Sequence, residues 1–180
     1  MTNHDTSDYD LDWSGVPMET VQQILHQGEM YLSSQLQAAL ASDQRSTTCA
    51  SIFIGLSAAL LAASLAQWSD GGSGAILHAG LVASAFLLAG AFCYFHAARP
   101  VDFYFPGNAP ESWFGTRKQG LVVAIGGEVE NYQFCISQNE DVLAGNAEWY
   151  RLGYRFALVA PIFGVLTFFL SSSLASAGTA

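Results

Sequence analysis

Three long segments without charged side chains constrain this chain more than any other feature. They cover residues 48–67, 75–97 and 156–174, and none of them contains Asp, Glu, Lys or Arg. At about 1.5 Å per helical residue, a segment of about twenty residues reaches about 30 Å, the thickness of a bilayer's hydrocarbon core. Buried helices of soluble proteins rarely stay uncharged over such lengths. The sequence therefore predicts an all-α fold, that of a helical integral membrane protein with three transmembrane helices.

The overall composition agrees with a membrane protein. Hydrophobic residues make up 51% of the 180 residues and charged residues 12%, about half the charged share of a typical soluble protein. Six Lys and Arg residues stand against 15 Asp and Glu residues, which gives a formal net charge of −9. A chain with so few basic residues has no surface that would neutralise phosphates, which excludes general binding to nucleic acid.

The distribution of the basic residues predicts the orientation in the membrane. With three spans, all six basic residues fall on one side, and the loop at residues 68–74 and the segment after Leu174 contain none. Basic residues near span ends mark the cytoplasmic face. We therefore expect a multi-pass protein of the bacterial inner membrane, with its N-terminus in the cytoplasm and its C-terminus outside. The six residues are Arg45, Arg99, Arg117, Lys118, Arg151 and Arg155.

The segment before the first span predicts a long cytoplasmic helix. Residues 1–16 are acidic, without an apolar period over most of their length, and are interpreted as a disordered tail. Pro17 suits a first helical position. From there, apolar residues recur at helical spacing and no helix breaker precedes the first span, so one continuous helix over 17–67 is expected. The short loop WSDGGSG then forces an antiparallel turn. Residues 17–97 are thus predicted to form an amphipathic helix plus a two-span hairpin.

Residues 98–118 have a different character and predict a cytoplasmic loop. Three prolines in this segment argue against any helix, and Pro106-Gly107-Asn108 is typical of a turn. Two interpretations of its aromatic residues stay open. They lie at the level of the lipid headgroups or pack on adjoining helices, or they form a site for a ligand or partner. The residues are Phe103, Tyr104, Phe105, Trp113 and Phe114.

Apolar residues recur at heptad spacing after the loop. Residues 119–154 are predicted to form a cytoplasmic helix with a 4-3-4-3 seam that all nearby acidic residues avoid. Asn139 and Asn146 lie in this seam. Buried seam asparagines can fix register and oligomeric state, but the same pattern arises where the seam packs against the N-terminal helix and the asparagines lie near water. The cytoplasmic seam is Ile125, Val129, Tyr132, Ile136, Asn139, Leu143, Asn146 and Tyr150.

The same rhythm continues into the third span, predicted over 155–175 and followed by an external tail, residues 176–180. The seam positions here are all small, which allows close approach of helix backbones in lipid or, as an alternative, lines a narrow pore. Pro161 should kink this helix. A similar small stripe in the first span comprises Ser51, Gly55, Ala59 and Ala63. Together with the cytoplasmic seam, the candidate assembly interface includes Gly153, Ala157, Ala160, Gly164, Thr167 and Ser171.

No chemistry-bearing motif accompanies these helices. The sequence has no P-loop, no GxGxxG, no GxSxG and no HExxH. His78 and His96 lie at opposite ends of the second span and do not meet at one metal. The three cysteines are explained as small buried hydrophobes. We therefore expect no catalytic, cofactor-binding or metal-ligating residue, no cofactor and no enzymatic activity.

The arrangement resembles the SLATT-type membrane effectors of bacterial conflict systems. The resemblance covers the architecture of residues 17–154. It rests on QLQAALASDQR entering the first span, on the glycine loop and on the helix after Lys118. It implies that the chain forms pores or perturbs membranes when a sensor partner signals. The third span departs from the minimal two-span pattern of that family.

Two classes of function remain open from the sequence. The first is a homo-oligomeric, pore-forming or membrane-perturbing effector that assembles through the seam. The second is a structural or accessory subunit of a larger membrane complex. In both, the partners are the lipid bilayer and either further copies of the chain or other membrane subunits, with no nucleic acid.

Overall fold

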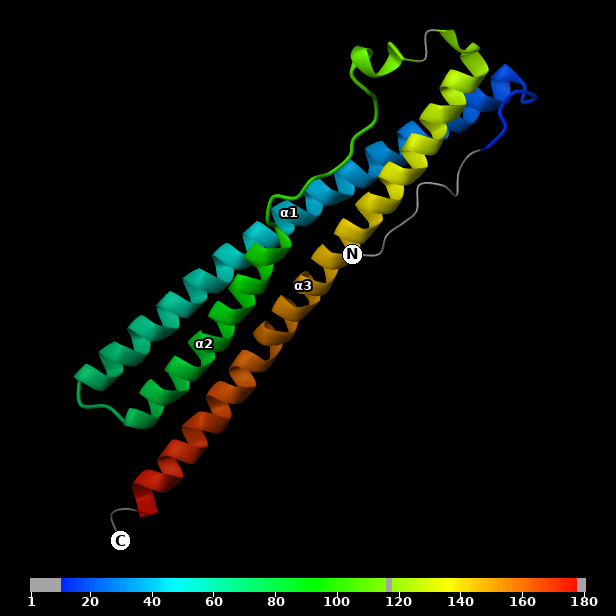
Figure 1. Cartoon of the computed structure of the whole chain (residues 1–180). Coiled ribbons are helices and arrows are strands. Elements are labelled where there is room, and N and C mark those ends of the chain that lie inside the picture. The colour runs from blue at the N-terminus through cyan, green and yellow to red at the C-terminus, as the bar shows by residue number, and fades with distance from the viewer. Residues whose placement is uncertain (1–10, 116–117, 178–180) are drawn as a thin grey trace. The chain divides into compact units, whose positions relative to one another are not determined.

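The computed structural model describes residues 11–115 and 118–177. Three long helices dominate it (Figure 1): α1 (Met18–Ser69), α2 (Gly74–Ala97) and α3 (Leu121–Ala177). The described residues contain no β-strand, so the all-α prediction is confirmed. All three helices are long and apolar enough to cross a membrane. Residues 1–10 of the predicted acidic tail and residues 178–180 of the predicted external tail lie outside the described residues.

Helix α1 is continuous over its 52 residues, as the lack of a breaker predicted. Pro17 lies just before its first residue, and its carbonyl accepts hydrogen bonds from the backbone N–H groups of Thr20 and Val21 at 3.0 and 3.2 Å. The chain reverses at residues 70–73, where Gly71 has a φ of +82°, a conformation that glycine adopts without strain. The hydroxyl of Ser73 then accepts from the N–H of Ala75 at 3.2 Å and caps α2.

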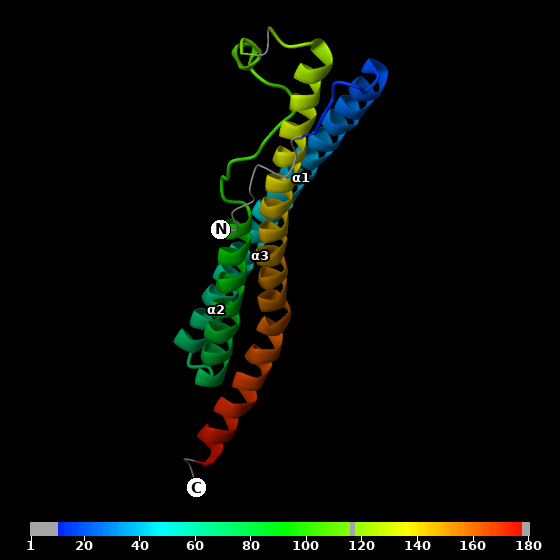
Figure 2. The same cartoon turned by 45° about the vertical axis from the view of Figure 1, so that its right-hand side comes forward.

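The helices divide between two compact units, and α1 and α3 each contribute to both. Unit 1 combines residues 11–40 with the described part of residues 101–143. Its first stretch of α1 and first stretch of α3 lie side by side (Figure 2), and they run parallel, because Gly28 lies against Tyr132 and Gln35 bonds to Asn139. Leu32, Tyr132 and Cys135 form the buried apolar core of this unit.

Unit 2 combines residues 41–100 with residues 144–177 and holds the three apolar segments. Helix α2 runs antiparallel to α1, since Ser57 pairs with Ser84 and Ser64 lies against Gly80. Figure 2 shows the axis of α3 bending in its orange part, near residue 160 on the colour bar. Pro161 lies in this part of the helix and lacks the N–H that would bond to residue 157, which is the predicted cause of a kink.

Two predictions about the loops need correction. The segment 98–118 does contain a helical turn, the short 3-10 helix η2 (Pro110–Trp113). Pro110 stands in its first turn, where a missing N–H costs nothing, so a proline that breaks a longer helix is compatible with this one. Residues 11–16 of the predicted disordered tail are ordered by contacts to α3: the indole Nε1 of Trp13 donates to Glu130 at 2.7 Å.

Candidate functional site

The fourteen seam positions form the inner face of α3. None of them is exposed: each is buried or half-buried against other parts of its own unit. The heptad rhythm therefore identified the packed face of α3 correctly. Seven of the fourteen are half-buried and keep part of their surface accessible, so their role as an assembly interface stays a prediction. The buried positions are Ile125, Tyr132, Asn139, Asn146, Gly153, Ala160 and Gly164.

Asn139 is the most constrained polar residue of unit 1. Its side chain is 0% exposed. The amide Nδ2 donates to the Oε1 atom of Gln35 at 3.1 Å and to the carbonyl of Tyr104 at 2.9 Å, while Oδ1 accepts from the N–H of Tyr104 at 2.9 Å. One side chain thus joins α1, α3 and the loop. Of the two interpretations that the sequence left open, packing against the N-terminal helix describes Asn139 within one copy, although its side chain is buried rather than near water.

Asn146 differs from Asn139 although it occupies the next equivalent position. It lies in unit 2 and is 8% exposed. Its side chain has no hydrogen-bond partner among the described residues. The two asparagines therefore share a heptad position without sharing a function.

The loop segment 104–108, here called the strap, is held on α3 by polar contacts beyond Asn139. The N–H of Gly107 donates to the hydroxyl of Tyr132 at 3.0 Å, and Nδ2 of Asn108 donates to both oxygens of Glu128 at 2.9 and 2.7 Å. Gly107 has a φ of +92°, as the predicted turn requires. The ring of Tyr104 packs edge-on against Phe134, which is the predicted packing on an adjoining helix. Phe105 and Phe114 are exposed instead.

Glu128 is a buried carboxylate that the sequence pattern did not single out. It avoids the seam, as predicted, but lies directly beside it and is only 9% exposed. Burial raises the pKa of this carboxyl, and the negative charge of Glu29 raises it further, whereas hydrogen bonds from Asn108 and Asn131 oppose the shift. Burial also raises the pKa of the Tyr132 hydroxyl, partly opposed by the Gly107 hydrogen bond.

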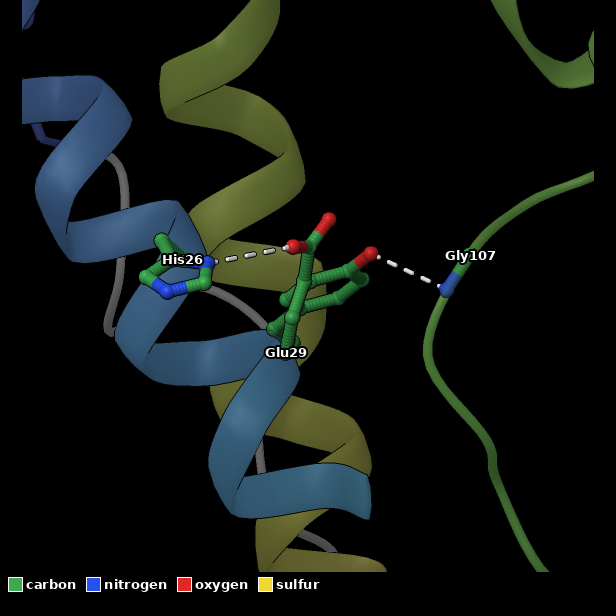
Figure 3. Close-up of polar contacts among 4 residues, drawn as sticks. His26, Glu29 and Gly107 are labelled. Atoms are coloured by element: carbon green, nitrogen blue, oxygen red, sulfur yellow. Dashed lines mark hydrogen bonds and ion pairs between the residues drawn. The ribbon is translucent and has the colours of Figure 1, made fainter.

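A groove of about 520 Å³ lies between the first part of α1 and the strap. Figure 3 shows its His26 and Glu29 side chains, whose nearest N and O atoms are 3.8 Å apart, and the Gly107 N–H donating at the strap. His26 is 62% and Glu29 45% exposed at the side chain. The remaining lining residues are Met30, Ser33, Ser34, Gln37 and Pro106. The exposed His26 and Glu29 side chains can form hydrogen bonds with a ligand, but they are not a buried nucleophile with its base.

The helices of unit 2 pack against one another through small residues rather than charged ones. The hydroxyls of Ser57 and Ser84 each donate to the other's backbone carbonyl at 3.2 Å, which pins α1 to α2. Gly90 and Gly153 bring the backbones of α2 and α3 together: a Cβ on either one would lie 3.1 Å from the carbonyl oxygen of the other. Backbones approach this closely only where side chains are absent.

The packed face of α1 in unit 2 is not the stripe that the sequence indicated. Ser46, Ser57 and Ser64 are buried, whereas Ser51, Gly55, Ala59 and Ala63 are exposed. Both sets recur at helical spacing and consist of small residues. Sequence alone therefore did not distinguish them, although the serines at positions 57, 64 and 84 were the available signal.

Gly164 lies at a close contact, as its position on the small stripe predicted. A Cβ there would come within 3.2 Å of the Cβ of Ala83 and 3.5 Å of the carbonyl oxygen of Ala79, both on α2. Beside it, an apolar cavity of about 420 Å³ is lined by residues of all three helices, including Leu60, Ile76, Leu87 and Pro161. Phe163 is 43% exposed and stacks on Phe86 with ring centroids 4.7 Å apart.

Across the described ranges, no group of three or more His, Cys, Asp or Glu side chains is arranged to hold a metal ion. The three cysteines are free thiols, and the hydroxyl of Tyr150 lies 3.9 Å from the sulfur of Cys49. The hydrogen bonds of the strap hold segment 104–108 against α3. The chain matches no protein-family model, no curated protein and no solved structure.

Proposed function

We propose that the chain is a non-enzymatic integral membrane protein of the bacterial inner membrane. Three helices, each with an apolar window fit to span the bilayer, support this proposal. Large apolar side chains cover the outer surface of unit 2, where lipid would solvate them. The basic residues give the orientation, with the N-terminus in the cytoplasm and the C-terminus outside. Representative outward residues are Ile52, Leu56, Leu88, Leu158, Ile162 and Phe169.

Within this assignment, a membrane-perturbing effector built from several copies is our first candidate. In unit 2 the Ser57–Ser84 contact holds α1 against α2, and the Gly90–Gly153 contact holds α2 against α3. No channel passes between the helices at these two positions. Any pore then has to form between copies. The exposed small residues of α1, here called the outward stripe, supply a surface for this contact. They are Ser51, Gly55, Ala59 and Ala63. A Cβ on Gly55 would meet nothing within 4 Å in its own copy. The resemblance to SLATT-type effectors favours the same function.

An accessory subunit of a larger membrane complex is the second candidate. It is favoured by the covered seam of α3, because a protomer that satisfies its own seam does not need a second copy to bury it. In this case the outward stripe of α1 would pack against helices of other proteins.

Leakage from liposomes separates the two candidates. Full-length protein reconstituted into dye-loaded liposomes should release the dye if it is the effector, and native mass spectrometry in mild detergent should then give a defined homo-oligomer. Gly55→Leu should abolish both signals, because leucine would hold the helices apart, whereas Gly55→Ala should preserve them. A tight membrane together with a monomer would contradict the effector and support the accessory subunit.

Topology is tested separately. Two reporters are fused after Ala180 in turn, one that functions only in the periplasm and one that functions only in the cytoplasm. Only the periplasmic reporter should be active. Activity of a cytoplasmic reporter at that end would overturn the proposed span count and orientation.

A further inference from the structure

The exposed basic side chains of unit 2 gather at one end of its apolar segments. Arg45 lies three residues before the first apolar segment, Arg99 lies two residues after the second, and Arg155 directly precedes the third. Arg151 lies one turn before Arg155, and all four side chains are exposed. The whole chain carries a formal net charge of −9. Positive charge concentrated at one place of such an acidic chain favours an anionic partner.

Three of these arginines border the contact between α1 and α3 and are here called the arginine patch: Arg45, Arg151 and Arg155. The contact joins the hydroxyl of Tyr150 and the sulfur of Cys49, which are 3.9 Å apart. Arg45 lies one helical turn before Cys49, and Arg151 directly follows Tyr150. Arg155 lies four residues after Arg151 and thus on the same face of α3. Hydrogen bonding to Cys49 and burial raise the pKa of the Tyr150 hydroxyl, whereas the charge of Arg45, which reaches across to α3, lowers it.

Helix α2 lies on the other side of α3. The ring centroid of Trp149 is 4.1 Å from that of His96 on α2. Trp149 and Arg151 are two residues apart, which is about 200° around the helix. The arginine patch therefore borders α1 and lies away from α2, so that Arg99, at the end of α2, is not part of it.

The described residues do not neutralise the arginine patch. Their one ion pair joins His26 to Glu29, in unit 1. Glu148 lies one turn before Arg151 and is exposed, but it is not within ion-pair distance of any arginine of the patch. The guanidinium groups thus remain accessible to an anion from outside the described part of the chain.

We propose that the arginine patch binds the phosphate group of an anionic phospholipid in the cytoplasmic leaflet. The inference rests on the proposed function, because insertion in that orientation places the patch at the lipid headgroups. Each guanidinium group offers paired N–H donors whose geometry matches the oxygens of a phosphate. Basic groups between membrane helices on the cytoplasmic side attract such headgroups.

The face of α3 that carries the patch continues as an apolar face. Leu158 follows Arg151 by seven residues, an interval that returns nearly to the same face of a helix. Ile162 follows Arg155 by the same interval, and the two apolar side chains are 53% and 56% exposed. Charged groups followed by apolar side chains match a phospholipid, in which the phosphate is followed by acyl chains. A soluble phosphate would contact only the charged part.

Tyr154 adds a neutral donor at the same level. It lies between Arg151 and Arg155 in the chain and is 54% exposed. Tyrosine is enriched at membrane interfaces, where its ring contacts the apolar layer and its hydroxyl reaches the headgroups. The hydroxyl of Tyr154 can therefore donate to the phosphate that the arginines bind.

The test measures lipid binding by native mass spectrometry of the full-length protein in mild detergent, with phosphatidylglycerol and phosphatidylcholine supplied in equal amounts. Wild-type protein should retain phosphatidylglycerol preferentially. Arg45→Gln combined with Arg151→Gln should weaken its retention by roughly tenfold or more, because two charges of the patch are lost. Arg99→Gln removes the same charge outside the patch and should leave retention unchanged. All three side chains are exposed, so circular dichroism should show unchanged helix content in both variants.

The proposal is overturned if wild-type protein retains the two lipids equally. It is also overturned if Arg99→Gln weakens retention as much as the double variant, since net charge alone would then explain the binding. Displacement of the lipid by excess soluble glycerol 3-phosphate would mean that the patch takes a free phosphate, which contradicts the lipid assignment. A preference that appears only after deletion of residues 1–10 would mean that the acidic N-terminus occupies the patch, which contradicts it as well.

Extraction of membranes with alkaline carbonate separates this inference from the function on which it rests. Wild-type protein that stays in the membrane pellet but shows no lipid preference overturns the inference alone. Protein that is released into the supernatant overturns the proposed function, and the inference with it.

Discussion

Replacement of Asn139 by leucine tests whether the seam asparagines act inside the protomer. In the wild-type protein the Asn139 side chain makes three hydrogen bonds, two to the backbone of Tyr104 and one to Gln35. Leucine removes all three and leaves Oε1 of the largely buried Gln35 without its donor, while Nε2 keeps its bond to the carbonyl of Ile136. At about 1 kcal/mol net for each bond, the loss is about 3 kcal/mol. Burial of the leucine side chain offsets part of this loss.

Asn146→Leu supplies the matched control. Asn146 is also buried but has no hydrogen-bond partner among the described residues, so leucine there gains burial and loses no bond. The gain from leucine enters both variants, and their difference in unfolding free energy isolates the hydrogen bonds. We expect Asn139→Leu to be less stable than Asn146→Leu by about 3 kcal/mol, the net value of its three bonds.

Hydrogen exchange locates the effect. Loss of about 3 kcal/mol should accelerate exchange at the strap amides, Tyr104 and Gly107, by about a hundredfold, while α2 keeps its protection. Denaturant unfolding followed by circular dichroism in detergent gives the global value. Equal stability of the two variants, with unchanged exchange in the strap, would refute the reasoning. A change in oligomer size for Asn139→Leu without loss of stability would support the assembly role.

Three further predictions follow from other contacts. Gly164→Leu should destabilise unit 2, because its side chain would meet Ala83 on α2, whereas Gly55→Leu should leave the thermal midpoint of the protomer unchanged; equal midpoints would contradict the contact. Trp13→Ala should lower stability by about 3 kcal/mol through loss of a packed indole and its bond to Glu130, and a negligible effect in denaturant titration would show that residues 11–16 do not dock. Because the pKa of Glu128 is raised in the folded state, its contribution to stability is present at low pH and is lost as pH rises through that pKa. The stability of Glu128→Gln relative to wild type should therefore increase between about pH 4 and pH 7, and a constant difference would contradict the shift.

The sequence alone determined the helices and their packed face. Long apolar segments without helix breakers leave a chain few alternatives to helix, so the single course of α1 and the antiparallel hairpin with α2 followed from composition and from seven loop residues. The rhythm from Ile125 to Ser171 likewise marked the inner face of α3, because the spacing of covered residues is a property of the helix itself.

The partner of each face was decided only by the tertiary structure. A heptad seam looks the same whether it meets another copy or another helix of the same chain, and Asn139 and Asn146 are alike until Gln35 and the strap reach one of them. The two stripes of small residues on α1 are equally ambiguous, since spacing fixes which residues share a face and not which face is covered. Glu128 was missed for the same reason. Its burial comes from the strap, which is distant in sequence, and local pattern carries no information about a contact that chain reversal creates.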